Sequence, residues 1–219
     1  MSDTIGVPPG RLDLKHDSQS LELLTIQHED VYSRLQSDGV VLPDISKSSY
    51  FEIPTCATAY AWMSRTLAEG RETHESFDPT AGAMFWLWAH VTRRALVSDA
   101  GAYGPGHVLL RCRLPRQRVL LSDFDAYHGA FFGDLIYSEE ELERAFADED
   151  FQTPLQEELA GKYGYGWSLF DLEPQERSRV QATWANMLVS TTRREGRWTQ
   201  ACVSHLEAGD VISGHPLHR

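Results

Sequence analysis

The chain has 219 residues, of which 42% are hydrophobic and 11% aromatic, and its formal net charge is -12. A chain of this size can bury one substantial core, so a single domain is expected. The negative charge repels phosphate backbones, which argues against a binder of duplex DNA or RNA. No stretch approaches the roughly 20 apolar residues that a membrane span requires, so no membrane association is expected.

The two ends of the chain differ in composition from its centre. Residues 1–20 are polar and rich in Ser, Asp, Pro and Gly, which predicts a mobile leader and not a secretory signal. Residues 21–212 form the predicted domain, and residues 213–219 a polar tail. The three cysteines are widely spaced among apolar or small neighbours, which favours buried, reduced thiols in a cytoplasmic protein.

The first predicted elements are a strand, a helix and a second helix. The apolar run at 21–27 predicts a strand, and 28–37 has the spacing of a short helix that Gly39 ends. Residues 40–43 fit a short strand or a loop. Residues 58–68 place their apolar side chains on one helical face, which predicts the second helix.

The middle of the chain reads as strands joined by loops. Residues 83–90 predict a strand on which Trp86 and Trp88 share a face. Residues 98–106 hold three glycines and a proline, which predicts a loop. The apolar run at 107–114 predicts the next strand.

The last third combines helices with a late strand. A short strand is predicted at 119–122, and Ser138 with Glu141 has the spacing of a capping box that opens a helix. Residues 173–190 predict a long helix, and 198–206 a strand. Short strands with segregated helices indicate a single α+β domain, in which a mixed or antiparallel central sheet carries flanking helices.

The strongest functional signal is an apolar run that ends abruptly in polar side chains. These side chains are Ser122, Asp123, Asp125, Tyr127 and His128. In extended geometry the two carboxylates share a face, and the imidazole could close on them after a turn. Such a group could contact a ligand, hold a divalent cation, or simply cap a turn. We expect ligand contact or a structural role here, and no metal.

A second group of candidates lies on other predicted strands. Thr25 and Gln27 flank Ile26 on the first strand, Trp86 and Trp88 share a face, and Gln200 lies on the late strand. If these strands form one sheet, they could wall a cleft in which tryptophan stacks on a base or nicotinamide ring. His90 stands at a strand end beside this cleft. Buried core is the alternative role for the paired tryptophans.

Arginines cluster locally in three places. They lie at 93–94, 111–118 and 193–197. Such groups could form an anionic-ligand pocket for a small phosphorylated molecule, or they could be solvated and paired on the surface.

Several of these segments together carry a resemblance to a known family. The chain resembles a bacterial family known only as domain-of-unknown-function family 3841. The matching pieces are residues 24–27, 60–63, 86–88, 120–128, 181–184 and 200–201. The chain departs from the family pattern where Met84 replaces a proline, Tyr127 a tryptophan, and Ser204 and His205 a tryptophan and a glutamate. The resemblance implies no activity, and its layout is loosely similar to that of mono-ADP-ribosyltransferases.

Two functions follow as expectations. In the first, the chain is a group transferase of the ADP-ribosyltransferase type that uses NAD or a similar nucleotide. Tryptophan stacks on the nicotinamide, and Arg93 or Arg94 neutralises the diphosphate. Asp123, Asp125 or Gln200 stabilises the cationic ribosyl centre or orients the acceptor. In the second, the chain is a non-catalytic module whose acidic surface meets a basic protein partner, and the polar segment after 119–122 is structural. The missing late glutamate counts against the transferase.

Overall fold

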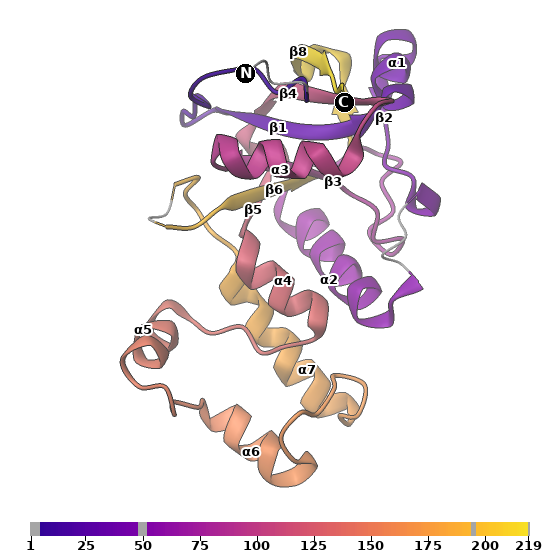
Figure 1. Ribbon diagram of the computed structural model, residues 1–219. Coiled ribbons are helices and arrows are strands. Elements are labelled where there is room, and N and C mark those ends of the chain that lie inside the picture. Colours follow the sequence, from indigo (N-terminus) through magenta and orange to yellow (C-terminus); the bar gives the residue numbers. More distant parts are fainter. Residues whose placement is uncertain (1–4, 48–51, 194–195, 219) are drawn as a thin grey trace.

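The computed structural model describes residues 5–47, 52–193 and 196–218. Its centre is a six-stranded sheet in the order β5-β6-β3-β1-β4-β8, in which the paired strands run antiparallel (Figure 1). A two-stranded sheet pairs β2 with β7. The strands are β1 (Ser20–His28), β2 (Val40–Val41), β3 (Phe85–His90), β4 (His107–Pro115), β5 (Leu120–Asp123), β6 (Thr199–Val203), β7 (Leu206–Glu207) and β8 (Val211–Pro216). The predicted single α+β domain with an antiparallel sheet is confirmed.

Helices surround this sheet and extend beyond it. The helices described are α1 (Glu29–Asp38), α2 (Pro54–Gly70), α3 (Arg93–Tyr103), α4 (Phe124–Phe132), α5 (Glu139–Ala147), α6 (Pro154–Tyr163) and α7 (Pro174–Thr183). Short 3-10 turns follow β4 at Arg116–Arg118 and α7 at Trp184–Met187. Among these helices, none combines the length and the apolar character needed to cross a membrane.

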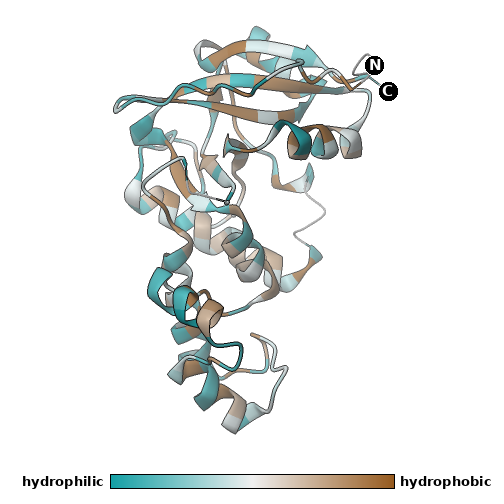
Figure 2. Ribbon diagram, turned by 60° about the vertical axis from the view of Figure 1, so that its left-hand side comes forward, coloured by the Kyte–Doolittle hydropathy of each residue, from teal (hydrophilic) through white to brown (hydrophobic). Residues whose placement is uncertain are grey.

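The first face of the sheet holds one hydrophobic core. Leu21 and Leu23 of β1 pack there with Phe85 and Leu87 of β3, and Leu35 of α1 joins them. On β3 buried and half-buried residues alternate, as expected for a strand whose two faces meet different surroundings. Figure 2 shows the strands as the most hydrophobic segments.

The second face is covered by helices on two sides. Leu24 of β1 packs against Leu96 of α3 in one cluster. Leu120 of β5 and Cys202 of β6 pack with side chains of α2 and α4, such as Met63 and Tyr127, in another. The second face therefore carries two hydrophobic clusters, one under α3 and one under α2 and α4. The strand ends between α3 and α4 lie at the border of these two clusters.

The sheet is strongly curled. Five residue steps join Pro115 of β4 to Leu120 of β5, although three strands lie between β4 and β5. A flat sheet would hold those strands about 19 Å apart. Five residues span at most about 18 Å even when fully extended and must also travel along the strands. The two sides of the sheet must therefore bend toward each other around the first core.

Residues 134–183 form a helical lobe, which projects from the sheet below α2 and α4 (Figure 1). Its helices begin with the predicted caps: Ser138 and Glu141 form a capping box on α5, and Pro174 lies in the first turn of α7. Trp184 follows α7 and is fully buried. Its indole N–H donates to the carbonyl of Asp134 at 2.9 Å, which ties the two ends of the lobe together.

Several predicted element boundaries are wrong for identifiable reasons. The loop predicted at 98–106 is largely α3, because Gly101 stands inside that helix and does not end it. The predicted helix 173–190 ends at Thr183, where a 3-10 turn follows. Val7 and Leu14, within the predicted leader, are buried against the α3 side of the sheet. β8 reaches Pro216, beyond the predicted end of the domain at 212.

Candidate functional site

Three of the predicted side chains lie in one row across neighbouring strands. Ser122 of β5 pairs with Gln200 of β6, and Gln200 pairs with Trp88 of β3. Directly opposed residues of antiparallel strands project from the same face of the sheet. We call Ser122, Gln200 and Trp88 the polar row; it lies on the second face.

An aromatic cluster surrounds the outer end of this row. It consists of Trp88, Phe124, His128 and Trp198, all of them half-buried. The ring centroid of Phe124 lies 4.7 Å from that of Trp88, 5.6 Å from Trp198 and 4.2 Å from His128. Half-buried rings at a sheet end can present an outer face to a planar ligand.

Deeper along the same face, Trp86 and Tyr127 pack together. Their ring centroids are 4.5 Å apart, and Tyr60 of α2 contacts both rings from the side. Burial raises the pKa of the Tyr127 phenol well above its ordinary value, so it stays protonated. This pair is part of the core, the alternative that the sequence left open for the tryptophans.

Polar atoms without partners gather at this place. Within the described residues, the Ser122 hydroxyl, the Gln200 side-chain amide nitrogen, the Trp86 indole nitrogen and the Tyr127 hydroxyl are buried and make no hydrogen bond. A buried donor left unsatisfied costs about 1–3 kcal/mol. Native proteins rarely keep several such groups side by side without a role for them. The polar row, with the aromatic cluster beside it, is therefore the strongest candidate site for a small ligand.

The two carboxylates of the polar segment do not act together. Asp123 is buried, its carboxylate accepts from the backbone N–H of Ala126 at 2.9 Å, and Arg197 lies 3.2 Å from its other oxygen. Asp125 is exposed in the first turn of α4. The predicted extended geometry is wrong because Asp123 is a helix N-cap, a position that aspartate favours. A shared carboxylate face is therefore excluded.

Substitution separates the two aspartates. We expect Asp123→Ala to lower the free energy of unfolding by about 1–3 kcal/mol, because it removes a cap and leaves Arg197 unpaired. Asp123→Asn keeps an oxygen that can accept the cap hydrogen bond, so its free energy of unfolding should fall by less than that of Asp123→Ala. Asp125→Ala should unfold like the wild type in urea, since its side chain is exposed. Equal losses for Asp123→Ala and Asp125→Ala would contradict the capping role.

Thr25 and Gln27 lie on the opposite face from the aromatic cluster. Leu24 is the β1 residue opposed to Trp88, and its neighbour Thr25 is opposed to Leu110, a member of the first core. The Thr25 hydroxyl donates to the carbonyl of Trp86 at 2.7 Å and accepts from the Gln27 amide at 2.7 Å. The prediction of a cleft between these residues and the tryptophans is therefore wrong. Thr25 lies on the first face of the sheet and bonds the backbone of β3 from that face.

His90 and Arg93 follow the polar row along the chain. Burial lowers the pKa of the His90 imidazole, and the positive charge of Arg193 lowers it further. Arg93 opens α3, and its Nε donates to the carbonyl of Pro8 at 3.1 Å. His128 is held by a contact of 2.8 Å between its Nδ1 and the carbonyl of Phe124.

Three residues of this region escaped the sequence analysis. Phe124 and Trp198 belong to the aromatic cluster, and Asp99 of α3 accepts from the Trp88 indole N–H at 3.3 Å. Burial raises the pKa of the Asp99 carboxyl, and the bond from Trp88 partly offsets this effect. Trp198 was readable as an aromatic residue at a strand start, but Asp99 required the unrecognised helix α3.

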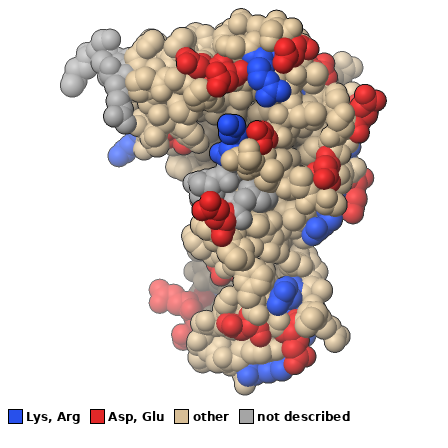
Figure 3. All heavy atoms as spheres, turned by 90° about the vertical axis from the view of Figure 1, so that its right-hand side faces the viewer, with Lys and Arg blue, Asp and Glu red and all other residues tan. Residues whose placement is uncertain are grey.

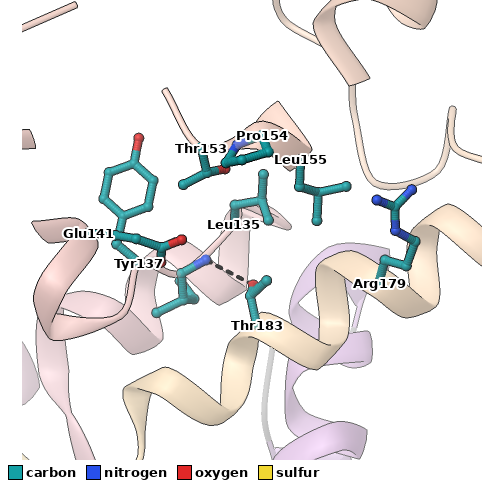
Figure 4. Close-up of a pocket in the computed structure, with 9 residues that line it drawn as sticks. Leu135, Tyr137, Glu141, Thr153, Pro154, Leu155, Arg179 and Thr183 are labelled. Carbon is teal, nitrogen blue, oxygen red and sulfur yellow. Dashed lines mark hydrogen bonds between the residues drawn. The ribbon is translucent and has the colours of Figure 1, made fainter. Parts of the chain in front are cut away.

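A cavity of about 270 Å³ lies in the helical lobe and is separate from this site (Figure 4). Leu135 and Leu155 line it together with Glu141 and Arg179. The lobe itself is acidic, with 13 Asp and Glu against four Lys and Arg in residues 134–183, a net charge of -9 out of -12. Figure 3 shows several acidic side chains on this lower end of the molecule, and others on the upper part.

The protein is an antiparallel α+β domain that carries the polar row and the aromatic cluster at one end of its sheet. The chain belongs to the family described as Domain of unknown function (DUF3841), whose model matches residues 22–212. This confirms the family resemblance seen in the sequence. No curated protein and no solved structure matches the chain significantly. The likeness to the layout of mono-ADP-ribosyltransferases stays a prediction.

Proposed function

We propose that this domain binds a nucleotide at the polar row and the aromatic cluster, with NAD as the first ligand to test. The single observation that carries the proposal is the group of buried, unpartnered donors beside half-buried aromatic rings. Nucleotide sites need both features, because a base presents hydrogen-bonding edges and two apolar faces.

Each residue has a distinct role in this proposal. The ring of Trp88 or Trp198 stacks on the base or the nicotinamide. The amide of Gln200 bonds the carboxamide or the base edge, and the Ser122 hydroxyl adds a second polar contact. His128, held by the carbonyl of Phe124, borders the ligand.

Transfer of a group from the bound nucleotide is the narrower form of the proposal. Asp123 is engaged with Ala126 and Arg197, which weakens its case as a catalytic group. Asp125 is exposed, so it could act only on an acceptor that reaches the molecular surface. Gln200 remains the best placed of the three predicted catalytic residues, because its amide is buried and unpartnered.

Thermal unfolding against NAD, ADP, ATP and sugar nucleotides tests the proposal. A ligand present at about 100 times its dissociation constant stabilises the native state by about 2.7 kcal/mol, or roughly 5–10 °C in midpoint for a chain of this length. Trp88→Ala should reduce that rise to about half or less, because an affinity at least about tenfold lower leaves at most about 1.4 kcal/mol of stabilisation. The matched control is Tyr165→Ala in the lobe, whose ring is 85% exposed and which should respond like the wild type.

Gln200→Met separates a binding role from a structural one. The substitution removes a buried amide without a partner and keeps the side-chain volume, so the unliganded protein should be as stable as the wild type or slightly more stable. Its response to the nucleotide should fall. A variant that is less stable but binds normally would assign Gln200 to the fold.

A binding module for a basic protein is the second candidate, and the charge of the lobe favours it. The lobe carries -9 of the total charge, and Phe146 and Tyr165 are 80% and 85% exposed on it. Exposed aromatic rings with acidic neighbours suit a surface rich in Lys and Arg. If no nucleotide of the panel shifts the midpoint of thermal unfolding, the binding of a basic protein would be favoured over the binding of a nucleotide.

A further inference from the structure

A cavity of about 480 Å³ lies at the end of the sheet where β1 and β6 begin. Segments far apart in the sequence meet there: His16 and Asp17 precede β1, Arg116 follows β4, and Thr191, Thr192 and Arg193 precede β6. The same end of the sheet carries His90 of β3 and the polar row.

Two arginines from different predicted clusters line this cavity. Arg116 donates to the carbonyl of Ser190, which fixes its guanidinium at the wall and leaves further N–H donors for a ligand. Arg193 is exposed at the opposite end of the 190–193 segment, and Arg194 lies outside the described residues. A planar guanidinium with several donors suits the oxygen atoms of a phosphate.

Among the described residues that line the cavity, the one acid is Asp17, and it is already engaged within its own turn. The Asp17 carboxylate accepts from the backbone N–H groups of Gln19 and Ser20, at 2.7 and 2.6 Å, and from the Ser20 hydroxyl at 3.0 Å. These donors stabilise the ionised carboxylate and leave its negative charge in place. Among the described lining residues two arginines still outnumber this one carboxylate, so the cavity carries a net positive charge although the protein as a whole is acidic.

His16 supplies a buried nitrogen to this place. Its Nδ1 is buried and has no hydrogen-bond partner among the described residues. Burial lowers the pKa of this imidazole, a hydrogen bond to the Ala89 backbone opposes that effect, and the charge of Arg193 lowers the pKa again. An anion beside His16 would favour the protonated ring, in which Nδ1 becomes a donor.

Backbone donors complete the arrangement. In the part of the chain that the structure describes, the N–H groups of Thr191 and Thr192 donate to no protein atom. Both threonines line the cavity, and the Thr191 hydroxyl donates to the carbonyl of Arg193 at 3.4 Å. Consecutive backbone N–H groups with hydroxyls and arginines form the usual surroundings of a bound phosphate.

We infer that this cavity binds a phosphoryl group, and that its ligand is the diphosphate of a nucleotide. The anion site stands on its own residues, while the assignment to a nucleotide rests on the proposed function. The link between the two is their position: His90 is paired with Thr199 at the start of β6, one residue before Gln200 of the polar row and at the end of the sheet where the cavity lies. A nucleotide could thus place its base at the aromatic cluster and its phosphates at Arg116 and Arg193.

Calorimetric titration of the full chain with inorganic pyrophosphate, and separately with ADP, tests this inference. Pyrophosphate should bind saturably, and Arg193→Gln should weaken it about tenfold, because one charge-assisted contact is lost. Arg193→Lys keeps the charge but not the paired donors, so its affinity for pyrophosphate should lie between those of the wild type and Arg193→Gln. Arg65→Gln, an exposed arginine on α2, is the matched control and should bind like the wild type.

The two proposals fail in different ways. Trp88→Ala should weaken ADP but leave pyrophosphate unchanged, whereas Arg193→Gln should weaken both. If ADP binds and pyrophosphate does not, or if Arg193→Gln binds pyrophosphate as tightly as Arg65→Gln, the anion site is overturned while the nucleotide site survives. If pyrophosphate binds through Arg193 and no nucleotide binds more tightly, the anion site stands and the nucleotide proposal fails.

Discussion

Trp184→Ala should lower the free energy of unfolding by about 3–5 kcal/mol, the range found when a large buried aromatic side chain is truncated. Trp184 is 0% exposed, and its ring packs edge-on against Trp62 of α2, with ring centroids 6.0 Å apart. Truncation leaves a cavity where α2, α4 and the 3-10 turn meet. It also leaves the carbonyl of Asp134 without its donor.

Urea unfolding monitored by circular dichroism measures this loss. Trp184→Phe keeps an aromatic ring but not the N–H donor, so it should lose clearly less than the alanine variant. Exposed Phe146→Ala controls for the removal of any aromatic residue in this part of the chain and should be close to the wild type. A loss below about 1 kcal/mol for Trp184→Ala would contradict its position at the junction of lobe and sheet.

Glu22→Gln should destabilise the protein by about 3 kcal/mol near neutral pH, since it removes a buried carboxylate that is paired with two partly exposed arginines and whose pKa falls on folding. Glu22 is 3% exposed on β1 and accepts hydrogen bonds from Arg111 and Arg113 of β4 and from the backbone of Lys15. Burial raises the pKa of this carboxyl, but the bonds from the two arginines outweigh that effect and lower the pKa to about 2.

The stabilisation by Glu22 depends on pH in a defined direction. Its pKa is about 2 in the folded chain and 4.5 ordinarily. A carboxyl whose pKa falls on folding stabilises the native state above its ordinary pKa, and that contribution disappears as the pH falls toward the folded pKa. The difference in stability between wild type and Glu22→Gln should therefore be constant above about pH 5 and shrink between about pH 5 and pH 2. Exposed Glu143→Gln is the control. A difference that does not change across this window would contradict the pairing.

Local patterns in the sequence predicted most of the sheet and several helix ends. The strand predicted at 83–90 is β3, the capping box at Ser138 opens α5, and Gly39 ends α1 with a positive φ of 81°. These features depend on a few neighbouring residues, so they can be read from sequence alone.

Long-range features of the site could not be predicted in the same way. Whether Thr25 shares a face with Trp88 depends on the strand order and on a register that pairs Leu24 with Trp88, and no local pattern contains that register. The helix α4 was missed because the polar segment after the predicted strand 119–122 was taken to stay extended through Asp125. In the structure Asp123 ends β5 and caps the helix.

The negative charge of the lobe can be counted from the sequence, but the net charge of the whole chain does not show where that charge lies. The net charge of -12 suggests a uniformly acidic protein, whereas residues 134–183 contribute -9 of it. The remaining chain is nearly balanced, which is why a cavity lined by Arg116 and Arg193 can be electropositive. Charge counted by segment therefore predicts more about binding surfaces than charge counted over the chain.

The most direct test of a nucleotide site at the polar row is calorimetric titration of NAD into the wild type and into Trp88→Ala. We predict saturable binding to the wild type and an affinity at least about tenfold lower for the variant, since stacking of one base on an aromatic ring contributes about 1–3 kcal/mol. Equal affinity in both proteins, or no heat of binding with NAD and the other nucleotides at millimolar concentration, would contradict the site.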